Sequence, residues 1–302
     1  ITGATKTTST QTTNGITYAT NVYNLSCTTL TQTELETDKS DNGLYQGTDD
    51  YGITYYYRGN VKNNIVKFAG FYWQIVRING DGSIRLIYDG TEKNATGENQ
   101  TIGTSRFNSS YTDPAYVGYM YGNPDGTTFD EVHTNTTSST IKTAVDNWYK
   151  TNIADKGYGS YISNAVGFCG DRNLPAGVWG TNDNGDGVNN TPQTSIFGAY
   201  ARYAKNVAQF TCPEPSRDLY TTTDSSIGNK SLTYPVGLIT YDELVFAGMD
   251  NRHINKLSWA YSTQHYWTMS PSYSDAASSH ASDWTLNNAG YPVSYTHLTL
   301  PT

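Results

Sequence analysis

The sequence is poor in charge. Charged residues make up only 15% of its 302 residues, well below the roughly 25% of ordinary soluble domains. Acidic residues outnumber basic ones by 27 to 19, which gives a formal net charge of −8. A nucleic-acid-binding surface needs clustered positive charge to displace phosphate counterions. This balance therefore argues against a nucleic-acid partner.

Long hydrophobic runs and familiar catalytic signatures are also missing. No stretch of 18 apolar residues exists that would span a membrane. The sequence contains no G-x-S-x-G nucleophile elbow, no phosphate-binding P-loop and no H-E-x-x-H zinc motif. No catalytic constellation is therefore predicted. The paired carboxylates of a glycosidase stay open, because they can lie far apart in sequence.

Tyrosine, glycine and small polar residues are abundant instead. The chain has 26 tyrosines and 28 glycines, and hydrophobic residues make up 36% of it. That is enough apolar material to build a core, so we expect a folded protein rather than a disordered one.

The first 43 residues differ in character from those that follow. The opening ITGATKTTSTQTT has seven threonines in thirteen residues and no apolar periodicity. Such a segment cannot bury enough surface to offset its chain entropy. We predict a flexible stalk or linker over 1–43, with a disordered tail as the alternative, and a folded domain over 44–292.

The last ten residues, VSYTHLTLPT (293–302), resemble the translation of a sequencing adapter. Pro292 also fits, because the adapter's first two bases can complete a proline codon. We therefore expect 293–302 to be an assembly artefact and the natural protein to continue past Tyr291 with other residues. A genuine tail of unusual composition is the alternative.

Runs of β-forming residues dominate the start of the predicted domain. The segments 52–61, 63–78 and 83–90 are rich in aromatic and β-branched residues. Asn79-Gly80-Asp81-Gly82 joins the last two, and Asn-Gly or Asp-Gly pairs accept the positive φ that hairpin turns need. We predict a β-hairpin at this place.

Helix signals follow at three places. Ser138 or Ser139 can cap a helix whose apolar face, at 3.6-residue spacing, consists of Ile141, Ala144, Val145 and Trp148. On its other side we expect an ion pair between Asp146 and Lys150. Thr240 and Glu243 form a capping box for a second helix, which ends at Gly248. A short helix at 199–209 and two strands complete the prediction, the strands at 265–269 and 283–291.

Several motifs in this order resemble a known group of proteins. They are YYYRG, FAGFYWQIVRINGDGSIRLIYDG, STIKTAVDNWYKTNI, YPVGLITYDELVFAG, YWTMSPSYS and a final W-x-L-x3-G. Between Leu44 and Tyr291 the chain is similar to cell-envelope proteins of gut Gram-positive bacteria. Their core resembles the C-type-lectin-like domains related to formylglycine-generating enzyme. The resemblance implies an α+β fold with a small antiparallel sheet, two helices and long irregular loops, here truncated at the C-terminus. It also implies a signal or membrane helix upstream of Ile1.

The three cysteines are interpreted within this exported setting. Cys169 and Cys212 could close a loop of about 44 residues through a disulfide, with free buried cysteines as the alternative. Cys27 is left over and could pair with something outside the sequence. Formylglycine-generating enzymes need a cysteine pair late in the domain, and no cysteine follows Cys212. The resemblance therefore does not carry that activity over.

One segment has half of a calcium-loop pattern. Asn182, Asn184 and Asp186 alternate and are followed by Gly187, as in the first half of such a loop. The twelfth position is Gln193 instead of a bidentate glutamate. A solvated turn is the favoured interpretation, calcium is the weaker one, and no other cofactor is predicted.

Aromatic residues mixed with short polar ones are frequent between 258 and 291. Tyrosine and tryptophan provide contact area at low entropic cost, which suits sugar rings and protein surfaces. We predict that the loops 270–283 and 287–290 contribute contacts, and that the ligand-binding residues are Tyr266, Trp267, Tyr273, Asp283, Trp284, Asn287 and Asn288. The alternative is that Tyr266, Trp267 and Trp284 belong to the core of the sheet.

These features together predict a non-enzymatic binding module. It would be extracellular and attached to the cell envelope through an N-terminal anchor outside the sequence, and it would recognise a glycan or a cell-surface protein. An enzyme of the formylglycine-generating type, or another hydrolase, with catalytic residues in the missing C-terminal part is a second possibility. A pilin-like structural subunit is a third.

Overall fold

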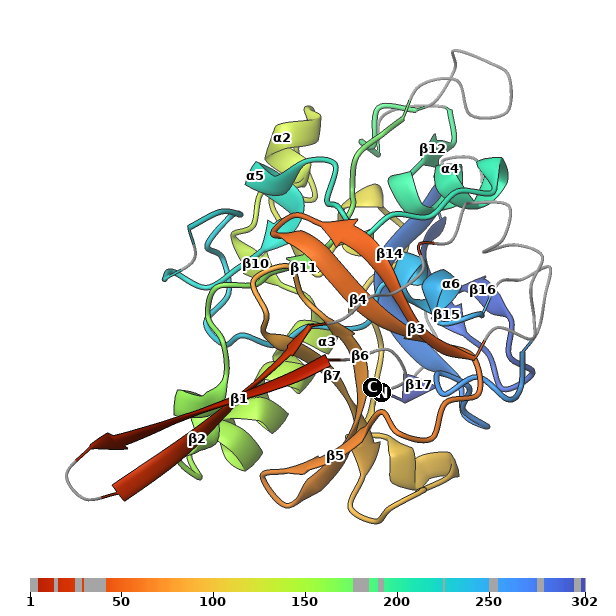
Figure 1. Cartoon of the computed structure of the whole chain (residues 1–302). Coiled ribbons are helices and arrows are strands. Elements are labelled where there is room, and N and C mark those ends of the chain that lie inside the picture. Colours follow the sequence, from red (N-terminus) through yellow and green to blue (C-terminus); the bar gives the residue numbers. More distant parts are fainter. Residues whose placement is uncertain are drawn as a thin grey trace.

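A computed structural model describes residues 5–13, 16–24, 29, 42–175, 185–189, 193–224, 226–249, 255–275, 280–295 and 300–301. Within these ranges the chain is a mixed α+β fold, with several small antiparallel sheets and five α-helices (Figure 1). This mixture of helices and antiparallel sheets confirms the α+β class predicted from the sequence. Cys27 lies outside the described residues.

The largest sheet is formed by the β-rich runs of the first half. Its strands are β3 (Gly43–Asp49), β4 (Gly52–Arg58), β5 (Ile65–Phe68), β6 (Phe71–Ile78) and β7 (Ile84–Gly90). All pairs are antiparallel. β4 and β5 pair with opposite ends of β6, and β7 pairs along nearly its whole length. β7 therefore lies on the other side of β6 from β4 and β5.

The hairpin predicted around Asn79–Gly82 is confirmed, with one difference. β6 and β7 pair across this turn, which is closed by a hydrogen bond from Asn79 N to Ser83 O at 2.8 Å. The run 63–78 is not one strand, however. It turns back on itself at Ala69 and Gly70, both with positive φ, so that β5 and β6 are themselves a tight hairpin.

The second sheet is formed by the end of the chain. Its order is β12-β14-β15-β16, and its strands are β12 (Ser195–Ile196), β14 (Tyr266–Asp275), β15 (His280–Leu286) and β16 (Pro292–Tyr295). The two strands predicted near 265–269 and 283–291 correspond to β14 and β15. Part of the segment 293–302 pairs with the rest of the protein, in β16 and in β17 (Leu300–Pro301). Its foreign origin stays a prediction.

Short two-stranded pairs complete the β-structure. β17 pairs with β8 (Thr104–Ser105), β9 (Met120–Tyr121) with β10 (Thr137–Ser138), and β11 (Phe168–Cys169) with β13 (Leu219–Tyr220). In the threonine-rich region, β1 (Thr5–Thr13) and β2 (Ile16–Asn24) form an antiparallel hairpin, which projects beyond the other elements in Figure 1. The sequence predicted no regular structure there, because β-pairing between polar strands leaves no apolar pattern. The role of 1–43 as a stalk stays a prediction.

The two helices with predicted caps begin at those caps, whereas the short helix predicted at 199–209 ends earlier, at Lys205, because Asn206 has positive φ. α3 (Thr140–Tyr149) is capped by the Ser139 side chain, which accepts from Lys142 N. The expected Asp146–Lys150 ion pair is wrong, because Asp146 pairs with the buried Lys142 and Lys150 pairs with Asp155. A π-helical turn (Lys150–Ala154) follows α3 directly. The shorter helical segments are α2 (Phe129–Val132), α4 (Gly198–Lys205), α5 (Pro215–Asp218) and the 3₁₀ turns η1 (Gly97–Gln100), η2 (Pro114–Val117) and η4 (Tyr158–Tyr161).

Helix α6 (Tyr241–Phe246) lies at the centre of the core. It begins at the predicted Thr240–Glu243 capping box, and all six of its residues are buried. Tyr241 packs in a cluster with Trp284 of β15, and Leu244 packs in another with residues of β4, β6 and β15. One short helix therefore joins the two sheets.

The predicted disulfide between Cys169 and Cys212 is present, with the two Cα atoms 5.5 Å apart. It ties β11 to the segment that precedes α5. Among the residues placed in the structure, no helix combines the length and apolar character needed to cross a bilayer.

Candidate functional site

The two tryptophans predicted as ligand contacts are core residues. Trp267 is 1% exposed, and its Nε1 donates to Ser105 O at 3.0 Å. Trp284 is 3% exposed and stacks on Tyr241, with ring centroids 4.7 Å apart. The sheet needs both side chains for packing, as the alternative interpretation of the sequence had it. In this conformation they have no surface to offer a ligand.

The other predicted contacts do not form one exposed surface either. Asp283 is buried, and burial raises the pKa of its carboxyl well above the usual range. The half-buried Tyr266 donates its hydroxyl to Ala260 O, and burial raises the pKa of this tyrosine. Tyr273 is half-buried against Tyr200. In the turn after β15, the Asn287 side chain accepts from two backbone N–H groups. Asn288 is the one predicted contact that is exposed.

The calcium-like segment is described only in part. Asn182 and Asn184 lie outside the described residues. Asp186 is exposed, and its carboxylate accepts a hydrogen bond from Val188 N at 3.1 Å, as in an ordinary turn. Within the ranges that the structure covers, no group of three His, Cys, Asp or Glu side chains could hold a metal ion.

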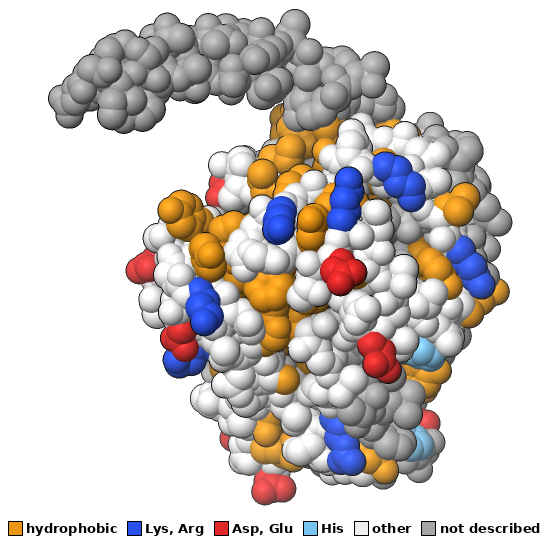
Figure 2. Space-filling view, turned by 90° about the horizontal axis from the view of Figure 1, so that it is seen from below, with side chains coloured by type: hydrophobic (Ala, Val, Ile, Leu, Met, Phe, Trp, Pro, Cys, Tyr) orange, Lys and Arg blue, Asp and Glu red, His pale blue; other side chains and the backbone are white. Residues whose placement is uncertain are grey.

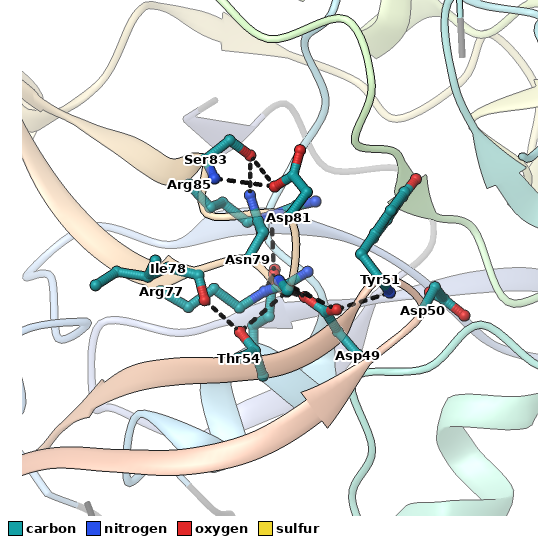
Figure 3. Close-up of polar contacts among 12 residues, drawn as sticks. Asp49, Asp50, Tyr51, Thr54, Arg77, Ile78, Asn79, Asp81, Ser83 and Arg85 are labelled. Carbon is teal, nitrogen blue, oxygen red and sulfur yellow. Dashed lines mark hydrogen bonds and ion pairs between the residues drawn. The ribbon is translucent and has the colours of Figure 1, made fainter. Parts of the chain in front are cut away.

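A buried ionic network lies between the large sheet and α6. Arg77 bridges Asp49 and Glu243, and Arg85 approaches Glu243 at 3.4 Å. Figure 3 shows the Asp49 carboxylate pointing at the Arg77 guanidinium and at the backbone N–H of Tyr51. Burial raises the pKa of Glu243, but Arg85 and Arg77 outweigh it and leave this pKa below its usual range. Burial lowers the pKa of Arg85 to about 10.

This network continues toward the disulfide. Arg202 pairs with Asp171 and with Asp242, the latter at 2.6 Å. Shifted pKa values of this kind can mark an active site. The space enclosed among these groups is only about 20 Å³, which is room for about one water molecule. The network therefore joins elements of the fold and offers no place for a substrate.

A larger cavity, of about 250 Å³, lies beside β7. It is lined by the consecutive residues 83–89 of the β6–β7 hairpin and by the segment 235–239, together with residues of α3 and of the segment 259–262. Figure 2 shows hydrophobic side chains gathered toward the middle of the face seen from below, between scattered charges of both signs. Most of the lining is apolar, as in typical small-ligand and side-chain pockets.

Aromatic rings form one wall of this cavity. Trp73 and Tyr88 are cross-strand neighbours on β6 and β7, with ring centroids 5.6 Å apart. Trp148 of α3 packs edge-on against both rings, at 6.1 and 5.3 Å. Its place on the apolar face of α3 brings it here. All three rings are half-buried, so each keeps surface for a ligand.

Hydrogen-bond acceptors gather where β7 ends, next to the aromatic wall of the cavity. The Asp89 carboxylate accepts from the side-chain amides of Gln74 and Gln100, each at 3.0 Å. Gln100 Oε1 accepts from the Ser262 hydroxyl, and Gln74 Oε1 is buried and has no partner among the residues that the structure describes. Burial raises the pKa of Asp89, and the two amides only partly offset this. A ligand that donates a hydrogen bond or carries positive charge fits this end.

Sequence reasoning missed this cavity. Trp148 was expected only as a packing residue, and Trp73 and Tyr88 only as part of β-rich runs. Their cross-strand pairing could have been sought by pairing residues outward from the hairpin turn. Two register shifts in the β6–β7 ladder, however, change which residues lie opposite each other. The segment 235–239 gives no local signal, because it has neither helical nor strand periodicity.

Comparison with known proteins adds no relative: no family model, no curated protein and no solved structure matches this chain.

Proposed function

We propose that the protein is a non-enzymatic binding module and that the cavity beside β7 is its ligand site. The observation that carries this proposal is the cavity itself, because it combines a half-buried aromatic wall with a small cluster of acceptors. Such a combination gives affinity through apolar contact and orientation through a few polar groups. The site needs no cofactor for this task.

A protein ligand fits the lining best. Apolar side chains of a partner can fill the space between Trp73, Trp148 and the segment 235–239 without bringing hydroxyls that need partners. A glycan is the second candidate, supported by the exposed aromatic residues near the cavity. Tyr161 is 77% exposed and lies edge-on to the ring of Phe68, which lines the cavity. A flat aromatic surface of this kind suits a sugar ring.

We place this module outside the cell, on the envelope, with the C-type-lectin-like core that the sequence motifs imply. The disulfide supports an oxidising compartment, because such bonds persist in secreted proteins and are rare in the cytosol.

Substitution of Ile84 tests the site. This side chain lines the cavity and is 54% exposed, so Ile84→Glu is expected to leave the fold intact and to place a charge at an apolar contact. Binding to arrays of cell-surface proteins, mucin glycans and wall polysaccharides should weaken by about tenfold or more, equal to about 1.4 kcal/mol.

Ile53 provides a matched control. It is 55% exposed, lies on β4 and does not line the cavity. Ile53→Glu should therefore bind as the wild type does. Equal binding by the wild type and Ile84→Glu, for every ligand that the wild type captures, would contradict the proposed site.

A further inference from the structure

Strand β7 is an edge of the large sheet. In the described part of the chain its only ladder is with β6, and no backbone group of Ile84–Asp89 bonds to any other segment there. In an antiparallel pair, alternate residues direct their N–H and C=O groups away from the partner strand. β7 therefore presents a row of backbone donors and acceptors on its outer side.

The cavity runs along this edge. Side chains on a strand alternate between the two faces of the sheet, so a cavity on one face would touch only every second residue. Here residues 83–89 line it without interruption. It also reaches Trp73 and Tyr88 on one face and Gln74, which pairs with Ile87, on the other. The space thus follows the strand and opens to both faces.

Two common protections of an exposed edge, lysine and proline, are missing on β7, although its ladder with β6 contains two register shifts. Natural edges are blunted by these residues, and also by bulges, inward-pointing charges or a covering element. β7 contains no proline or lysine, and its one arginine, Arg85, is 8% exposed and turned toward Glu243. The exposed residue is the apolar Ile84. Such an edge is suited to pairing with another strand.

The acidic residue near the end of β7 indicates which side chain a pairing strand would carry. Asp89 is 4% exposed, and among the described residues it receives side-chain hydrogen bonds only from two neutral amides, with Gln74 Oε1, which has no partner among them, beside it. A buried carboxylate without a cation is costly. A lysine or arginine of the ligand would supply the missing charge.

We propose that the ligand is an extended peptide segment of a partner protein that adds as a strand to β7, with its apolar side chains in the cavity and a lysine or arginine at Asp89. This inference rests on the proposed binding function and names its ligand class. Backbone hydrogen bonds give affinity in this mode of recognition, and the side-chain pockets give specificity.

Synthetic acetylated peptides test the proposal directly. The probe is a short peptide with one lysine followed by alternating valine and serine, compared with the same peptide N-methylated at alternate residues. We expect the unmodified peptide to bind and the methylated one to lose at least about tenfold in affinity. In hydrogen exchange, bound peptide should slow the outward-facing amides of β7 and leave those of β3 unchanged. Equal binding of the two peptides, or no binding of either, overturns strand addition.

The cationic end is tested by Asp89→Asn, which keeps the shape of the side chain and removes its charge. The wild type should prefer the lysine peptide over a norleucine analogue, and the variant should lose this preference while still binding both. Asp81→Asn, at an exposed position in the turn before β7, is the control and should keep the preference. A variant that still prefers lysine overturns the role of Asp89.

Other outcomes separate this inference from the proposed function. Capture of a glycan that is weakened by Ile84→Glu, without peptide binding, overturns strand addition and leaves the binding site standing. Slow exchange of the outward β7 amides in the free protein shows that the chain covers its own edge, and overturns the inference as well. If Ile84→Glu weakens the binding of no ligand, both proposals are contradicted.

Discussion

His133 shows how burial fixes the chemistry of a single residue. Its side chain is fully buried, its Nε2 lies 3.0 Å from Gly187 O, and its ring packs on Phe129 with centroids 4.3 Å apart. Because the carbonyl can only accept, Nε2 carries the proton and donates. Burial, assisted by the nearby Arg172, lowers the pKa of His133 to about 3. This histidine stays neutral at any ordinary pH and serves packing, not proton transfer.

The pH dependence of stability follows from this shift. In the unfolded chain the pKa returns to about 6.5, so between about pH 6.5 and 3 the unfolded state binds one more proton than the folded state. The contribution of His133 is fully present above pH 6.5. It is lost as pH falls, by about 1.4 kcal/mol per unit.

Replacement of His133 by glutamine tests this pH dependence. His133→Gln keeps a donor for Gly187 and cannot take up the proton, so its unfolding free energy should fall less steeply between about pH 6 and 4. Urea unfolding across this range measures the slope. His280→Gln, at an exposed position, should leave the slope as in the wild type. An unchanged slope in His133→Gln would count against this account.

The β6–β7 hairpin shows what local sequence can and cannot predict about an element. Asp81-Gly82 predicted a turn because glycine accepts positive φ, and Gly82 has φ of 86°. Position 80 requires glycine for a different reason, which is lack of space. A Cβ placed there would lie 2.4 Å from Gly52 N and 2.6 Å from the Asp49 carboxylate, because the β3–β4 turn and the β6–β7 turn touch. No local pattern records that contact.

Gly80→Ala is therefore expected to destabilise the protein. The added methyl group must separate two backbone turns and disturb the hydrogen bond from Gly80 N to Asp49, at a cost of about 1–3 kcal/mol. Gly159→Ala is the matched control, since a Cβ at Gly159 meets no heavy atom within 4 Å. Thermal or urea unfolding of both variants gives the comparison. Equal stability of the two variants would contradict the close approach.

The distinction between local sequence signals and tertiary contacts explains how much of the fold and the site was predictable. The hairpin turn, the Ser139 cap and the Thr240–Glu243 capping box were found, because each is encoded within a few residues. The ligand cavity was not, because Trp148 and the segment 235–239 meet β7 only through tertiary packing. Aromatic residues in β14 and β15 suit a core as well as a surface, so the sequence could not place Trp267 and Trp284.

At the scale of the whole molecule, the disulfide joins parts that are far apart in sequence. Cys169 and Cys212 are separated by 43 positions, and Cys212 N also donates to the Asp50 carboxylate of the large sheet at 2.9 Å. The bond thus closes a long loop against the sheet. In the chain-entropy model, a loop of this length corresponds to about 4 kcal/mol.

Loss of this bond should lower the unfolding free energy by about that amount. The variant carrying Cys169→Ser and Cys212→Ser, and the wild type with reductant, are expected to unfold at similarly reduced urea concentrations. Reductant should have no further effect on the double variant. A double variant as stable as the oxidised wild type would contradict a structural role for the bond.

The position of helix α6 between the two sheets affects how the protein unfolds. Its six buried residues are shared by both sheets, so neither sheet can separate without exposing the same helix to water. A half-open intermediate would keep the entropy cost of the remaining half and lose the packing that offsets it. We therefore expect the two larger sheets to unfold together, in one cooperative transition, even though the β-structure is divided among several small sheets.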